Sequence, residues 1–200
     1  MLKIINLVKK EFLQFFRLPL YLLLWCAVIA SPIIFKNYFP PSQNIQSQII
    51  VLLLMSFFII IYVSDTTKNE ITKGTCVFLF NYKCNFFQIS ISKVIYFSFI
   101  LMPFIISTLL FGIFKFYSPS IYLLLINEVI CTYLFSLVFK KYDLITFFVS
   151  IVLFIVQYYL ISKLKLNIFI EVFLLSVLFV LFIFAGNCYY KSFSFRKEVR

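Results

Sequence analysis

The fold of this chain is decided by stretches such as residues 120–139, SIYLLLINEVICTYLFSLVF, in which Glu128 is the only charged side chain. A helix of about 20 mostly apolar residues is long enough to span the hydrocarbon core of a bilayer. Similar stretches recur along the chain, and we expect six spans, at residues 18–35, 49–64, 94–114, 120–139, 144–162 and 168–187. The sequence therefore predicts an all-α, polytopic membrane protein with six transmembrane helices.

The composition supports this class of protein. Of the 200 residues, 64% are hydrophobic and only 12% are charged, whereas a soluble domain has about 25% charged residues. The chain has no histidine and three glycines, which excludes Ser-His hydrolases, HExxH metalloproteases and a GxxxxGK[ST] nucleotide-binding loop. We therefore expect no enzyme activity and no cofactor bound by the chain itself.

The positive charges predict the orientation in the membrane, because cytoplasmic segments retain Lys and Arg. With the N-terminus inside, all but four of the 18 Lys and Arg residues lie on the cytoplasmic side, the exceptions being Lys36, Lys115, Lys163 and Lys165. We expect a multi-pass protein of the plasma membrane with both termini cytoplasmic and a basic tail at residues 188–200. Anionic inner-leaflet lipid accounts for the net charge of +11 without a nucleic-acid partner.

Residues 1–17, before the first span, have the pattern of an amphipathic helix. On a helical projection, one arc of about 120° gathers apolar side chains, namely those of Ile4, Ile5, Val8, Phe12, Phe15 and Phe16. Most of the lysines lie on the opposite side. This pattern predicts an interfacial helix whose lysines meet anionic lipid headgroups; the alternative is a flank that only fixes the orientation.

Residues 65–93 form the longest predicted cytoplasmic connection, and about half of them are apolar. A contiguous exposed apolar patch usually marks an interaction site, so a partner or the membrane is expected to cover this loop. The alternative is a re-entrant packing segment that has no partner.

The spacing in this loop resembles the coupling region of ABC-2 type transporter permease subunits. In that family a Glu and a Gly-Thr pair follow span two, and a leucine-rich stretch and a Lys precede span three. The matching positions here are Glu70, Gly74, Thr75, Leu79 and Lys93. The pattern departs at Val77 and Lys83, where a second acidic residue and a proline are usual. The N-terminal helix and the six spans fit the same layout.

The resemblance implies a permease subunit of an ATP-driven exporter. ATP would be bound by a separate cytoplasmic ATPase subunit docked on the 65–93 loop, and a second permease chain, identical or different, would complete the translocation path. Glu70, Gly74 and Thr75 would shape the coupling helix, and Leu79 and Phe80 are candidates for its contact face. Short outer loops and an apolar interior fit a hydrophobic or amphipathic cargo, such as a peptide, drug or lipid-like molecule.

Three polar residues inside the spans are candidates for the translocation path. Glu128 lies well inside its span beside Asn127, and a charge at that depth costs about 2.5–3.5 kcal/mol on insertion scales. Glu128 either lines the path and favours cationic or proton-coupled cargo, or bonds to a neighbouring helix or across a dimer interface. Gln157 offers hydrogen bonds either to cargo or to another helix.

Two other classes of function also fit six spans. One is the substrate-capture subunit of an energy-coupling-factor vitamin importer, which the long 65–93 loop fits poorly. The other is a membrane immunity protein that sequesters a toxin peptide without any ATPase.

Overall fold

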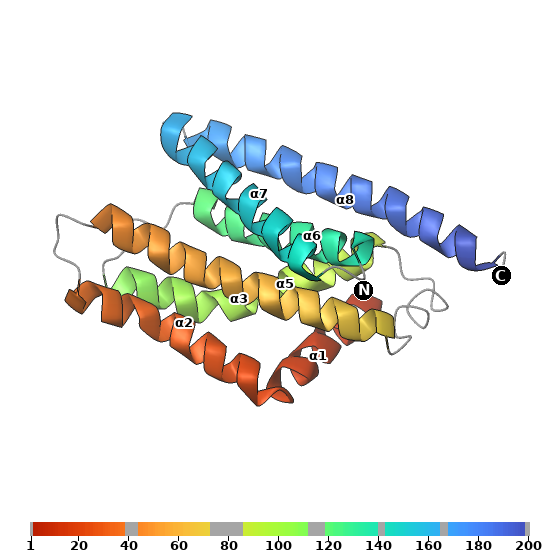
Figure 1. Cartoon of the computed structure of the whole chain (residues 1–200), viewed down its shortest axis with the longest axis horizontal. Helices are drawn as coiled ribbons and strands as arrows, with labels where there is room; N and C mark the ends of the chain where they lie inside the picture. Colours follow the sequence, from red (N-terminus) through yellow and green to blue (C-terminus); the bar gives the residue numbers. More distant parts are fainter. Residues whose placement is uncertain are drawn as a thin grey trace.

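The structure, a computed structural model, describes residues 2–38, 44–72, 86–111, 119–139, 143–164 and 168–198. Within these ranges every regular element is an α-helix, which confirms that the fold is all-α. Figure 1 shows the helices in chain order: α1 (Leu2–Phe16), α2 (Pro19–Tyr38), α3 (Asn44–Thr72), α5 (Phe86–Leu110), α6 (Pro119–Val138), α7 (Asp143–Leu164) and α8 (Ile168–Glu198).

Five helices are long and apolar enough to cross a membrane: α2, α3, α5, α6 and α8. The sixth predicted span, 144–162, is also helical and lies within α7. Its apolar stretch among the described residues, Leu144–Tyr159, is shorter than the other five. The structure thus supports a membrane-embedded helical protein with five candidate spans, and a sixth crossing by α7 stays a prediction.

Several helices extend beyond the predicted spans. Residues 65–72 continue α3 and residues 86–93 begin α5, although both were expected in the long connection. Within α3, the Thr66 hydroxyl donates to the carbonyl of Tyr62 at 2.8 Å and the Thr67 hydroxyl to that of Val63 at 2.6 Å. Such bonds satisfy buried hydroxyls inside the helix. At the other end of the chain, α8 continues to Glu198 through most of the expected tail.

Helix α6 is the centre of the bundle. It packs against α3, α5, α7 and α8, and every side chain from 124 to 134 is buried. Figure 1 shows α2, α3 and α5 on one side of α6, and α7 and α8 on the other. Helix α1 lies at one end of the bundle, against α5 and α2; we call this the α1 end.

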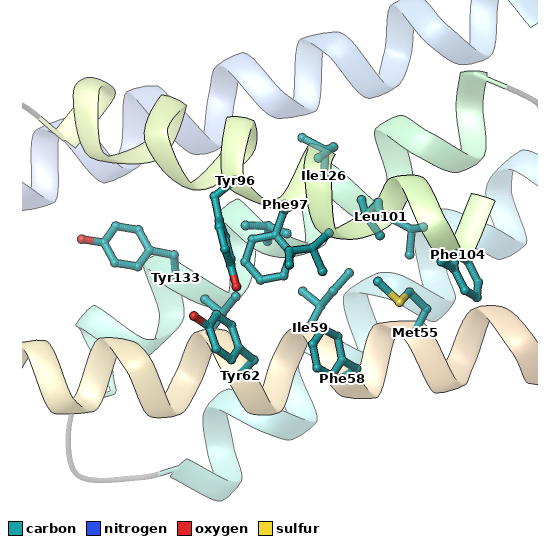
Figure 2. Close-up of a cluster of buried hydrophobic side chains, with 14 of the residues drawn as sticks. Met55, Phe58, Ile59, Tyr62, Tyr96, Phe97, Leu101, Phe104, Ile126 and Tyr133 are labelled. Carbon is teal, nitrogen blue, oxygen red and sulfur yellow. The ribbon is translucent and has the colours of Figure 1, made fainter. Parts of the chain in front are cut away.

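Aromatic and branched side chains from three helices form the core. Figure 2 shows Met55, Phe58, Ile59 and Tyr62 of α3 facing Tyr96, Phe97, Leu101 and Phe104 of α5, with Ile126 and Tyr133 of α6. The rings of Tyr62 and Phe97 meet edge to face with centroids 5.8 Å apart, and those of Tyr62 and Tyr96 stack at 5.9 Å. Such close packing holds helices together in lipid, where the hydrophobic effect between helices is weak.

Helix α1 divides its predicted apolar arc between two environments. Of that arc, Phe15 is buried against the bundle, next to Leu7 and Glu11, which lie outside the arc, whereas Ile5 and Phe16 remain more than half exposed. A helix that is apolar on its outer side beside exposed lysines is suited to the lipid–water interface. The interfacial position of α1 stays a prediction.

Candidate functional site

Four charged side chains meet at the α1 end, where α1, α3 and α5 converge. Lys93 of α5 lies with its Nζ 2.9 Å from Oε1 of Glu11 and 3.8 Å from Oε1 of Glu70. Lys10 of α1 donates to the same Glu70 oxygen at 2.6 Å. We call Lys10, Glu11, Glu70 and Lys93 the charge cluster; it contains two positive and two negative groups.

The charge cluster is almost entirely removed from solvent. Lys93 and Glu70 are 1% and 2% exposed, Glu11 is buried, and only Lys10 reaches the surface. Burying ionised groups is costly unless each has a counter-charge and hydrogen bonds. The pairing of the four groups therefore holds three helices in one arrangement, since moving any of them separates a buried charge from its partner.

Aromatic rings close the charge cluster on its inner side. The Nζ of Lys93 lies over the ring of Tyr133 of α6, 4.8 Å from its centroid, a distance that gives a favourable cation–π contact. That ring stacks in turn on Phe86, the first residue of α5, at 5.6 Å. The hydroxyl of Tyr62 donates to the backbone carbonyl of Glu11 at 3.5 Å. The charge cluster is thus joined to the aromatic core of Figure 2.

The sequence predicts part of this arrangement. Glu70 and Lys93 are the first and last residues of the family pattern. Glu70 lies in α3 and Lys93 in α5, and their side chains contact each other. The other predicted coupling residues, Gly74, Thr75, Leu79 and Phe80, lie outside the described residues. Lys10 and Glu11 are not predicted from the family pattern. One feature of the sequence could have indicated Glu11. It is the only acidic residue among the first 64 residues, and it lies beside the apolar arc of its helix.

The three polar residues predicted inside the spans are all buried but do not form one group. The Asn127 amide donates to the Leu175 carbonyl of α8 at 3.0 Å, which fixes two neighbouring helices. Neither carboxyl oxygen of Glu128 has a hydrogen-bond partner among the described residues, although the side chain is 1% exposed. Gln157 is buried on α7. Asn127 thus links α6 to α8 through its amide nitrogen, whereas its side-chain oxygen, that of Gln157 and both carboxyl oxygens of Glu128 have no hydrogen-bond partner among the described residues.

Two cavities lie along the contact between α3 and α7. One, of about 350 Å³, is at the α1 end and is lined by Ile60, Ile61, Ser64, Asp65, Lys68, Leu144 and Phe147. The other, of about 330 Å³, is toward the opposite end and is lined by Ile49, Leu52, Leu53, Phe154, Ile155, Tyr158 and Tyr159. We call the contact between these two helices the α3–α7 seam. It is loosely packed toward each of its two ends.

Comparison with known proteins gives no assignment: no protein-family model, curated protein or solved structure matches this chain. Among the described residues, no group of three or more His, Cys, Asp or Glu side chains could hold a metal ion. The chemistry visible in the described part of the chain consists of the charge cluster, the buried Glu128 and the α3–α7 seam.

Proposed function

We propose that this chain is the membrane-embedded permease subunit of an ATP-driven exporter, and that its partner ATPase docks on the segment between α3 and α5. The observation that carries the proposal is the charge cluster. Glu70 lies near the end of α3 and Lys93 in the second turn of α5, and both bind α1 through buried ion pairs. A partner that pushes on residues 73–85 would therefore act on three helices at once.

The charge cluster suits the transmission of force. Removing one partner of a buried ion pair costs about 3–5 kcal/mol, so the ends of α1, α3 and α5 are expected to move together as a unit. Tyr133 under Lys93 extends this connection to the central helix α6. Displacement at the α1 end would thereby reach the helix that contacts α3, α5, α7 and α8. Glu70 and Lys93 have transmission roles in this proposal and take part in no chemistry.

The proposal includes the remaining features of the expected exporter. Six helices cross the plasma membrane, α7 among them, with the α1 end and both termini in the cytoplasm. A second permease chain, identical or different, completes the path, and ATP is bound by the ATPase alone. The exposed apolar faces of α7 and α8, which include Phe148, Val152, Phe173 and Phe184, suit contact with lipid or with that second chain. Cargo is hydrophobic or amphipathic.

The test is affinity purification of the tagged chain from its own host after cross-linking in intact membranes, with mass spectrometry of the co-purified proteins. We expect a stoichiometric Walker-type ATPase. Replacing residues 75–85 with a Gly/Ser linker of equal length should remove the ATPase while leaving Phe86 and its stacking on Tyr133 in place. The same replacement of residues 112–118, between α5 and α6, is the matched control and should retain it.

Two outcomes would contradict the proposal. An ATPase that is retained by the 75–85 variant would exclude the docking segment. Recovery of the cross-linked chain with no ATPase would exclude the exporter, and would favour the vitamin-capture subunit if a vitamin co-purifies or the immunity protein if a toxin peptide does.

A further inference from the structure

The side chains that α7 turns toward the bundle are mainly polar. Thr146, Ser150 and Gln157 are buried together with Phe154, while the exposed positions hold Leu, Ile, Phe, Val and Tyr. Helix α7 packs against α6 and α3. The polar side of α7 therefore faces these two helices, along the seam that carries both cavities.

The direction of Glu128 follows from its neighbours on α6. Asn127 bonds to α8 and the Tyr133 ring stacks on α5. Successive helical residues are rotated by about 100°, so Glu128 points about 100° away from Asn127 and about 140° away from Tyr133. The remaining direction leads to the contact between α3 and α7, the other two helices that pack against α6, and Thr132 lies one turn further along the same face of α6.

The hydroxyl groups of Ser56 on α3 and Ser150 on α7 lie at a similar height along the bundle. The ring of Phe57 on α3 stacks on that of Phe147 on α7 with centroids 5.8 Å apart. Because these helices run in opposite directions (Figure 1), Ser56 and Ser150 both lie slightly beyond that pair, away from the α1 end. Among the described residues, both hydroxyls are buried without a hydrogen-bond partner, as is that of Thr132.

We propose that Glu128 is a proton-binding site that exchanges its proton with water entering the α3–α7 seam from the α1 end. A buried carboxyl group with no counter-charge is more stable as the neutral acid than as the carboxylate. Hydroxyl groups both donate and accept hydrogen bonds, so Thr132, which lies one turn nearer the α1 end than Glu128, can pass a proton between Glu128 and water from the cavity at Asp65 and Lys68. This inference goes beyond the proposed exporter and does not depend on a partner ATPase.

The charged groups on the helices around α6 are engaged elsewhere or lie at its ends. Lys93 on α5 binds the charge cluster, Glu171 on α8 accepts from Ser120 at 2.7 Å, and Asp65 on α3 accepts from Asn69 at 3.1 Å. Lys68 lines the cavity at the α1 end, and Tyr158 of α7 lines the opposite cavity. Among the described residues, none of these groups forms an ion pair or hydrogen bond with Glu128.

The protonation state is tested with dicyclohexylcarbodiimide, which enters lipid and modifies protonated carboxyl groups. The full chain in lipid vesicles is treated at neutral pH and the modified residues are mapped by mass spectrometry. We expect modification of Glu128. Glu11 and Glu70 are buried controls that should stay unmodified, because each lies in an ion pair with a lysine. Absence of modification at Glu128 would overturn the proposal.

Proton exchange is tested by infrared spectroscopy of the same vesicles. We expect a protonated carboxyl band that is absent in Glu128→Gln and that shifts promptly on transfer to D2O. Thr132→Ala should slow this shift severalfold. Ser176→Ala is the matched control, because its hydroxyl bonds within α8 to the Val172 carbonyl at 2.7 Å, and it should leave the rate unchanged. A band that does not shift, or that both variants slow equally, would identify Glu128 as a purely structural acid.

Discussion

At the scale of single residues, the charge cluster and Glu128 solve the same physical problem in different ways. Lys93 and Glu11 form a buried ion pair, with Nζ and Oε1 2.9 Å apart. Glu128 has no such partner among the described residues, and in our proposal it binds a proton instead. Paired charges hold helices in place, whereas an unpaired carboxyl group can bind and release a proton.

The pairing predicts the effect of removing the lysine. Lys93→Met leaves Glu11 buried without its counter-charge and should lower the free energy of unfolding by about 3–5 kcal/mol. The measurement is the unfolding transition of the purified chain in detergent micelles. Lys9→Met, at an exposed position of α1, is the control and should change stability little.

A second substitution separates the loss of the pair from a loss of packing. In Lys93→Met/Glu11→Gln both members of the pair are neutral, so part of the lost stability should return. If the double variant is as unstable as the sum of the two single variants, the ion pair makes no contribution of its own.

At the scale of elements, α8 is the least enclosed helix. Only 11% of its span is buried, and in Figure 1 its C-terminal part extends past the rest of the bundle. Its close approach to α5 takes place at Gly186, where a Cβ atom would overlap the ring of Phe86. A residue without a side chain is needed there for the two helices to meet.

This close approach predicts that Gly186→Leu separates α8 from α5. The added side chain cannot fit against Phe86, so the C-terminal half of α8 should become more accessible to protease in detergent micelles. Ala185→Leu places the same side chain at the neighbouring exposed position and should leave cleavage unchanged. Equal cleavage of both variants and the native chain would show that α8 does not depend on this contact.

At the scale of the whole molecule, α7 decides the topology. If α7 crosses the membrane, six crossings place both ends of the chain on one side; if it does not, five place them on opposite sides. The positive charges favour six crossings, because all but four Lys and Arg residues then lie on the cytoplasmic side.

We therefore expect that Lys3→Cys, Lys141→Cys and Glu198→Cys, each made in a cysteine-free chain, react with a membrane-impermeant maleimide from the cytoplasmic side. Lys115→Cys and Lys165→Cys should react from the outside. The measurement uses intact cells and inverted vesicles. Reaction of Lys141→Cys and Lys165→Cys from the same side would show that α7 does not cross.

The sequence by itself determined the helical fold, because uninterrupted apolar stretches of this length can satisfy their backbone groups in lipid only as helices. It predicted six spans, and five of them are helices long and apolar enough to cross a membrane. It also singled out Glu128, because a charge inside an apolar span is rare, whereas Glu70 and Lys93 were predicted from the resemblance to the coupling region of a permease family. Only the tertiary structure decided which charges are paired. Lys93 and Glu11 are 82 residues apart, and their contact depends on how α1 packs against α5, which no local pattern specifies. Glu128 is the only charged residue in its own span, so a counter-charge would have to come from another helix. Among the described residues, the packing brings none to it.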